Sequence, residues 1–174
     1  MLHPMNFRVD QVFATDVGSV GAALVDESYL TEGMAKLPDV GAPVMESQNR
    51  TGTVIRQRLR YSFTGSLPSA VTRFVSASKL SWVEDSVIDL SSCRATFTMT
   101  PVHYKQFFRC SGEWVLMAMD SPGAPKTLRR IDGKLKVNSP VPFLGGEVER
   151  AIISGLQERL ALEPAVLEAW LANR

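Results

Sequence analysis

The sequence predicts an α+β domain in which one curved antiparallel sheet is covered by a long C-terminal helix. Strand-like segments follow one another from residue 44 to residue 137, turns rich in Gly and Pro join them, and a helical pattern fills residues 146–174. Strands joined by tight turns pair antiparallel, because parallel pairs need long crossover connections. A twisted sheet of about seven strands curls. One helix is too narrow to fill its concave face, and we expect a ligand-binding space between them.

Composition restricts the classes of protein that fit. The chain has 174 residues, 45% of them hydrophobic and 21% charged, as expected for one soluble globular domain. Its 19 basic and 18 acidic residues give a net charge of +1, which disfavours a nucleic-acid partner. The longest uncharged apolar run, residues 114–119, is too short to cross a bilayer. We therefore predict no transmembrane segment and a cytoplasmic location, with transient membrane contact left open.

The N-terminal part predicts one strand and two short helices. Residues 6–13 alternate between apolar and polar side chains, as in a half-buried strand. Val17, Val20 and Leu24 then recur at helical spacing. A second short helix is expected over residues 29–37, because Pro38 cannot continue it.

The middle of the chain reads as strands interrupted by one short helix over residues 67–75. Arg56, Arg58 and Arg60 alternate on one strand face. A single-stranded nucleic-acid site would place aromatic residues on that same face, so we interpret it as a solvated outer face. The expected strands are residues 44–48, 53–63, 79–87, 93–100, 105–119 and 127–137.

The C-terminal helix carries an apolar residue at every fourth position, with Glu149 expected on the opposite side. Pro164 removes a backbone donor and predicts a kink near Leu160. The pair Gly145–Gly146 is interpreted as a hinge between strand and helix, because acidic residues follow it and a phosphate loop would need a lysine or hydroxyl. The expected inner face consists of Val148, Ile152, Leu156 and Leu160.

Four stretches carry a resemblance to a known superfamily. They are "MNFRVDQVF", "LPSAVTRFV", "VPFLGGEVERAI" and "AVLEAWL". With this element order, the chain resembles the START-like (SRPBCC) superfamily, also called the helix-grip or birch-pollen-allergen-like fold. Within it, the chain is most similar to a bacterial family known as domain of unknown function 2505. Residues 81–105 match that family poorly.

The resemblance implies a single domain over residues 5–174, preceded by a short extension at residues 1–4. It further implies a seven-stranded sheet gripping a kinked helix around an apolar cavity. Members of the superfamily bind or transfer lipids, sterols, quinones and hormones, or cyclise polyketides. The family supplies no ligand or catalytic residues to carry over.

We predict that an apolar molecule such as a lipid, quinone or polyketide-like compound binds between sheet and helix. Methionines suit such a site because they adapt to irregular shapes. The predicted wall residues are Tyr61, Phe97, Met99, Trp114, Ile131, Leu135, Ile152 and Leu156.

Catalytic and metal sites have weaker support. His3 and His103 are the only histidines, Cys93 and Cys110 fit buried free thiols, and no metal-ligand spacing occurs. We therefore predict no metal and no cofactor, and the lack of a catalytic cluster favours a protein that is not an enzyme. Two alternatives stay open. One is a cyclase or hydrolase using His103, Tyr104 or Tyr61 in the same cavity, and the other is a protein-interaction module with a closed core. Both a monomer and a homodimer fit.

Overall fold

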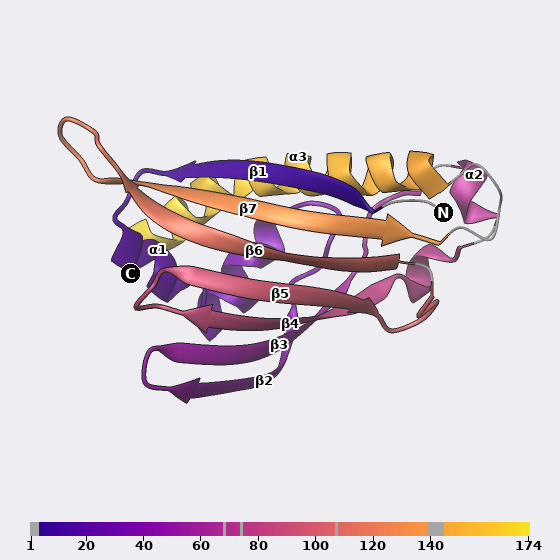
Figure 1. Cartoon of the computed structure of the whole chain (residues 1–174), viewed down its shortest axis with the longest axis horizontal. Helices are drawn as coiled ribbons and strands as arrows, with labels where there is room; N and C mark the ends of the chain where they lie inside the picture. The colour runs from indigo at the N-terminus through magenta and orange to yellow at the C-terminus, as the bar shows by residue number, and fades with distance from the viewer. Residues whose placement is uncertain (1–3, 68, 74, 107, 139–144) are drawn as a thin grey trace.

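The computed structural model describes residues 4–67, 69–73, 75–106, 108–138 and 145–174. Its centre is a seven-stranded antiparallel sheet in the order β1-β7-β6-β5-β4-β3-β2 (Figure 1). The chain order of strands is followed except that β1 pairs with the last strand, β7. The strands are β1 (Met5–Phe13), β2 (Val44–Thr51), β3 (Val54–Ser62), β4 (Ser81–Asp89), β5 (Arg94–Pro101), β6 (Phe108–Met119) and β7 (Lys126–Val137).

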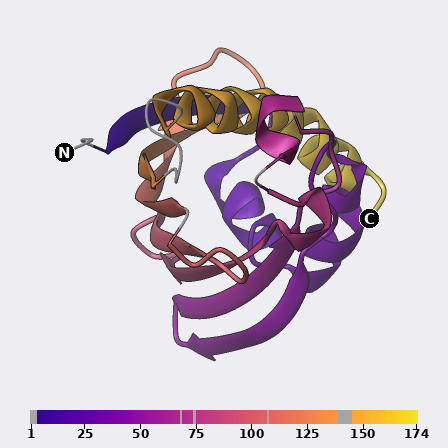
Figure 2. The ribbon, with the colours of Figure 1, turned by 90° about the vertical axis from the view of Figure 1, so that its right-hand side faces the viewer.

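The helices lie on one side of this sheet. Seen end-on, strands and helices form a ring, with α3 closing it above β1 (Figure 2). The long helix packs along β1 and β7, and its N-terminal and C-terminal halves run in different directions (Figure 1). The helical segments are α1 (Val17–Ala23), the π-helix η1 (Tyr29–Gly33), the 3-10 helix η2 (Met34–Lys36), α2 (Ser69–Thr72), the 3-10 helix η3 (Ala77–Lys79) and α3 (Gly145–Ala172).

The predicted α+β helix-grip architecture is thus confirmed. The helix predicted over residues 67–75 is short: α2 covers four residues, and Pro68 and Phe74 lie outside the described part of the chain. The predicted hinge glycines, Gly145 and Gly146, are the first two residues of α3, and the segment that would connect them to β7, residues 139–144, lies outside the described part of the chain.

Two glycines shape the middle of the concave face. Gly112 on β6 and Gly133 on β7 are partners in the register. A Cβ atom at Gly112 would lie 2.6 Å from the ring of Phe97, and one at Gly133 would collide with the ring of Phe7. Glycine is required at both positions because the two phenylalanine rings lie directly against the sheet backbone.

The inner face of α3 differs from the predicted one. Ile152 is 37% exposed, whereas its neighbour Ile153 is 8% exposed and belongs to the core. Glu149, predicted on the outer side, is 3% exposed and accepts a hydrogen bond of 2.7 Å from the Val137 amide. The spacing of four used for the prediction drifts around a helix of 3.6 residues per turn. The true inner positions alternate spacings of four and three, and they include acidic residues.

The outer face of the sheet carries the predicted charged stripe. Arg58 donates to Glu46 at 3.0 Å and to Asp85 at 2.9 Å, and Arg60 donates to Glu46. These paired, exposed arginines confirm the solvated outer face. Among the described residues, no helix is long and apolar enough to cross a membrane.

Candidate ligand-binding site

Seven of the eight predicted wall residues contribute to the interior. The eighth, Ile152, points away from it, so this prediction is wrong, and Ile153 occupies the inward position. For the predicted residues on strands, the register explains why they face the interior, because residues paired across neighbouring strands share a face. Tyr61, Phe97, Trp114, Ile131 and Leu135 are buried in the core, and Met99 and Leu156 are partly buried against it.

Strand β4 brings a row of polar side chains into this apolar interior. Trp82, Glu84 and Ser86 alternate along the strand and therefore share one face. The register pairs Trp82 with Tyr61, and it pairs Glu84 with Leu59 on one side and Met99 on the other. This places all three side chains on the concave face. We call Trp82, Glu84 and Ser86 the β4 row.

The β4 row is short of hydrogen-bond partners. Within the described residues, Trp82 Nε1 and Ser86 Oγ are buried and have no partner. No described residue forms a hydrogen bond with the Glu84 carboxyl either. Buried polar groups are nearly always satisfied in native proteins, so these atoms require a partner that the described side chains do not supply, which can be an ordered water or a bound molecule.

Glu84 has an unusual protonation equilibrium. Burial, which disfavours its charged form, raises the pKa of this carboxyl from 4.5 to about 7. The negative charges of Glu163 and Asp85 raise the pKa further, and the positive charge of Arg129 opposes them. At neutral pH, a large share of the molecules therefore carries an uncharged carboxylic acid here, which can donate a hydrogen bond.

The hydroxyl of Tyr61 and the thiol of Cys110, both near the β4 row, are uncharged. The Tyr61 ring stacks on Trp82 with a centroid separation of 5.7 Å and an angle of 12°. Burial and the charge of Glu84 keep the pKa of Tyr61 well above its usual value. The same two causes raise the pKa of Cys110 to about 12, so its thiol stays protonated and is no nucleophile.

A second polar cluster lies farther along the interior, and its members bond to one another through the Glu163 carboxylate. Glu163 on α3 accepts hydrogen bonds from Arg129 at 3.2 Å, from Gln11 at 2.9 Å and from Tyr29 at 3.4 Å. The guanidinium of Arg129 also lies over the Trp114 ring, 5.2 Å from its centre. This cluster fastens α3 to β1, β7 and η1, and we assign it a structural role.

The remaining candidates for catalysis or metal binding do not lie in the interior. His103 is exposed in the segment between β5 and β6, and Tyr104 beside it is 37% exposed. The structure thus removes these two from an interior active site. Within the residues described, no group of three or more potential ligands is arranged to hold a metal ion.

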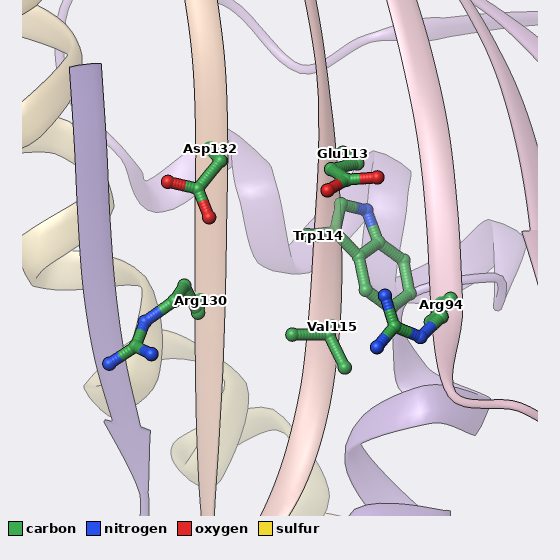
Figure 3. A pocket seen from close by; sticks show the side chains of 6 residues that line it. All are labelled: Arg94, Glu113, Trp114, Val115, Arg130 and Asp132. Atoms are coloured by element: carbon green, nitrogen blue, oxygen red, sulfur yellow. The ribbon is translucent and has the colours of Figure 1, made fainter. Parts of the chain in front are cut away.

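A small hollow on the outer face is no ligand site. Its volume of about 20 Å³ has room for about one water molecule. Arg130 beside it is bound to Asp10 at 2.9 Å. The hollow is lined by Arg94, Glu113, Trp114, Val115, Arg130 and Asp132 (Figure 3).

Sequence reasoning missed the β4 row. The stretch "SWVEDSVID" contains two adjacent carboxylates, and the pattern does not tell which of them faces inward. The structure turns Asp85 outward to Arg58 and Glu84 inward. Trp82 and Ile88 are in phase with Glu84, but Val83 and Val87 are equally in phase with Asp85, so the sequence carries no signal that separates the two faces.

The curved seven-stranded sheet and the long C-terminal helix that packs along it define the helix-grip α+β fold. The chain belongs to the family described as "Protein of unknown function (DUF2505)", whose model matches residues 8–171. No curated protein sequence matches the chain significantly.

Solved structures share this fold at low sequence identity. The protein TTHA0849 from Thermus thermophilus has a TM-score of 0.62 and 18% identity, over 97% of this chain and 98% of that one. The Zhui aromatase/cyclase from Streptomyces sp. R1128 has a TM-score of 0.63 and 14% identity, over 99% and 96%. Ara h 8.0201 has a TM-score of 0.55 and 16% identity, over 99% and 100%. These similarities establish the fold.

Proposed function

We propose that the protein binds a small, largely apolar molecule between the concave face of the sheet and α3. The observation that carries this proposal is the β4 row: Trp82 Nε1 and Ser86 Oγ are buried without partners among the described residues, and the partly exposed Glu84 lies between them in an apolar interior. A closed core of this kind would be unstable, because each buried unsatisfied group costs about 1–3 kcal/mol. A ligand that supplies the missing hydrogen bonds removes this cost.

Partial exposure of inward-facing side chains supports the same proposal. Trp82, Glu84 and Met99 share the concave face, yet each keeps accessible surface. Farther along the same strands, Ile88 and Ala95 are fully packed. The interior is thus less completely filled around the β4 row, where we place the ligand. A lipid, a quinone or a polyketide-like compound fits this description, and the alternative of a closed-core interaction module does not explain it.

The experiment is native mass spectrometry of the protein purified from its host, followed by solvent extraction. We expect an apolar small molecule to copurify with the wild type. Met99→Trp fills space beside the β4 row and should abolish copurification of the ligand. Met117→Trp is the matched control and should keep it, because Met117 lies out of phase with the inward-facing Leu116. Absence of any extractable ligand, together with no binding of added lipids or quinones at micromolar concentration, would contradict the proposal.

One observation favours a second candidate function, an acid–base enzyme in the same interior. A general acid or base works best when its pKa lies near the working pH, and Glu84 meets this condition. Tyr61 is the aromatic hydroxyl beside it. The test is to incubate the extracted ligand with wild type and Glu84→Gln: conversion by the wild type alone assigns an enzyme, and unchanged ligand in both assigns a carrier or sensor.

We also propose a cytoplasmic location, since Cys93 and Cys110 are both free thiols and thiols persist in reducing compartments. Fractionation of host cells tests this.

A further inference from the structure

The β4 row is unusual in the kind of hydrogen bond it offers. Trp82 Nε1 can only donate, and the Ser86 hydroxyl can donate or accept. Ser86 is 4% exposed, and neither atom has a partner within the described residues. A protonated Glu84 adds a third donor in the middle of the row. Three neighbouring donors in an apolar interior call for a ligand with acceptor oxygens.

The remaining unpartnered groups show the same excess of donors. Arg129 Nε and Arg159 Nη2 are buried without partners among the described residues, and both can only donate. Among these remaining unpartnered atoms of the described residues, Gln11 Oε1 is the one acceptor. Acceptor-rich ligands therefore fit this interior better than amines or other donors.

The charges around the row favour a neutral ligand over a carboxylate. Arg129 is paired with Glu163 at 3.2 Å. Arg159 donates to the backbone carbonyls of Pro38 at 2.8 Å and Val40 at 3.2 Å. A carboxylate placed beside the row would meet Glu84, whose ionised form repels it.

The apolar surroundings favour a flat, ring-bearing molecule. The rings of Tyr61 and Trp82 are stacked nearly parallel and together form a flat aromatic surface. Met99, opposite Glu84 in the register, adds a polarisable side chain that contacts aromatic rings favourably. A conjugated ring can pack against these side chains while its polar group forms hydrogen bonds with the β4 row.

We propose that Trp82, Glu84 and Ser86 recognise the carbonyl oxygen of a neutral, ring-bearing apolar ketone or quinone. This rests on the proposed ligand-binding function and names the ligand class for that same site. Glu84 serves in its protonated form, donating to the carbonyl, so binding weakens as Glu84 ionises. The groups that share its electrostatic environment are Asp85 on the same strand, Tyr61 on β3, Cys110 on β6, Arg129 on β7 and Glu163 on α3.

The test compares three probes of one shape by fluorescence titration at pH 6 and pH 8. They are 2-acetylnaphthalene, its isostere 2-isopropylnaphthalene, which lacks the carbonyl, and 2-naphthoate. At pH 6 we expect the wild type to bind the ketone about 10-fold more tightly than the isostere, as about 1.4 kcal/mol of hydrogen bonding would give. At pH 8 this preference should shrink, with binding of the isostere unchanged.

Variants assign the preference to the row. Trp82→Phe, Ser86→Ala and Glu84→Leu should each reduce the preference for the ketone while still binding the isostere. Glu84→Gln should keep it at both pH values, because an amide donates a hydrogen bond and does not ionise. Glu113→Gln on the outer face of β6 is the matched control and should behave as the wild type.

The outcomes separate this inference from the proposed function. Equal affinity for ketone and isostere would overturn carbonyl recognition and leave the apolar site standing. Preferred binding of 2-naphthoate would overturn the neutral ligand class. If none of the three probes binds, the ring-bearing ligand class is overturned, and the proposed function is then decided by the extraction experiment.

Discussion

Gln11 on β1 donates a hydrogen bond of 2.6 Å from Nε2 to the carbonyl oxygen of Leu160 on α3. In a regular helix, that carbonyl would accept from the amide four residues later. The residue there is Pro164, which has no amide hydrogen. Gln11 thus supplies the donor that the proline lacks, and α3 continues through Pro164 while changing direction over the sheet (Figure 1).

Replacing Gln11 by Ala should destabilise the protein by about 2 kcal/mol, because the Leu160 carbonyl loses its donor. In a Pro164→Ala background the helix supplies that donor itself, so the same replacement should cost about 1 kcal/mol less. Urea unfolding of the four variants measures the free energies of unfolding. An equal cost in both backgrounds would show that Gln11 does not compensate for the proline.

The buried pair Arg129–Glu163 should matter far more than an exposed pair. Glu163→Ala leaves the Arg129 guanidinium buried without its carboxylate, and we expect a loss of about 3–5 kcal/mol. The matched control is Asp10→Ala, which breaks the exposed pair with Arg130 and should cost less than about 1 kcal/mol. Similar losses in the two variants would contradict the structural role given to Glu163.

Two adjacent isoleucines test which face of α3 is buried. Ile153→Ala removes core volume and should cost about 2–4 kcal/mol. Ile152→Ala changes an exposed position and should stay within about 0.5 kcal/mol of the wild type. Thermal or urea unfolding distinguishes them, and the reverse order would restore the face predicted from the sequence.

Glu84 should make stability depend on pH in a particular direction. Its pKa in the folded protein, about 7, lies above the value of 4.5 expected when unfolded. Between these values the folded state binds more protons, so stability falls as pH rises from about 4.5 through 7. The side chain keeps some contact with water, and we expect the loss to be about 2 kcal/mol.

Glu84→Gln should remove this part of the pH dependence and be more stable than the wild type at pH 8. Glu113→Gln on the outer face should leave the wild-type profile unchanged. Unfolding free energies measured from pH 4 to pH 8 give the comparison. Parallel profiles for wild type and Glu84→Gln would mean that Glu84 ionises normally in the folded protein.

The sheet was predictable because its strands carry clear signals. Alternation in residues such as Phe7, Val9 and Phe13 marks one buried face, and turn residues mark the boundaries. The same rule predicts Tyr61 and Phe97 on the inner side, and both side chains are buried in the core.

The polar interior was not predictable, because it breaks the rule that apolar residues face inward. Glu84, Glu149 and Glu163 occupy inward positions that hydrophobic patterning assigns to the surface. On α3, Glu149 and Glu163 conceal the buried face, and the apolar pattern therefore predicts Ile152 inside in place of Ile153. Which polar groups are buried depends on how the strands pair. It also depends on Pro164, because the Leu160 carbonyl that this proline leaves without a helical donor accepts a hydrogen bond from Gln11.

The indole N–H resonance of Trp82 tests the central claim most directly. It is identified in the NMR spectrum of the ¹⁵N-labelled protein by its loss in Trp82→Phe. On addition of 2-acetylnaphthalene at pH 6, a ligand bound at the β4 row should shift the Trp82 indole signal and leave that of Trp170, at the far end of α3, in place. If the ketone leaves the Trp82 indole signal unchanged, the β4 row does not bind it and the account is wrong.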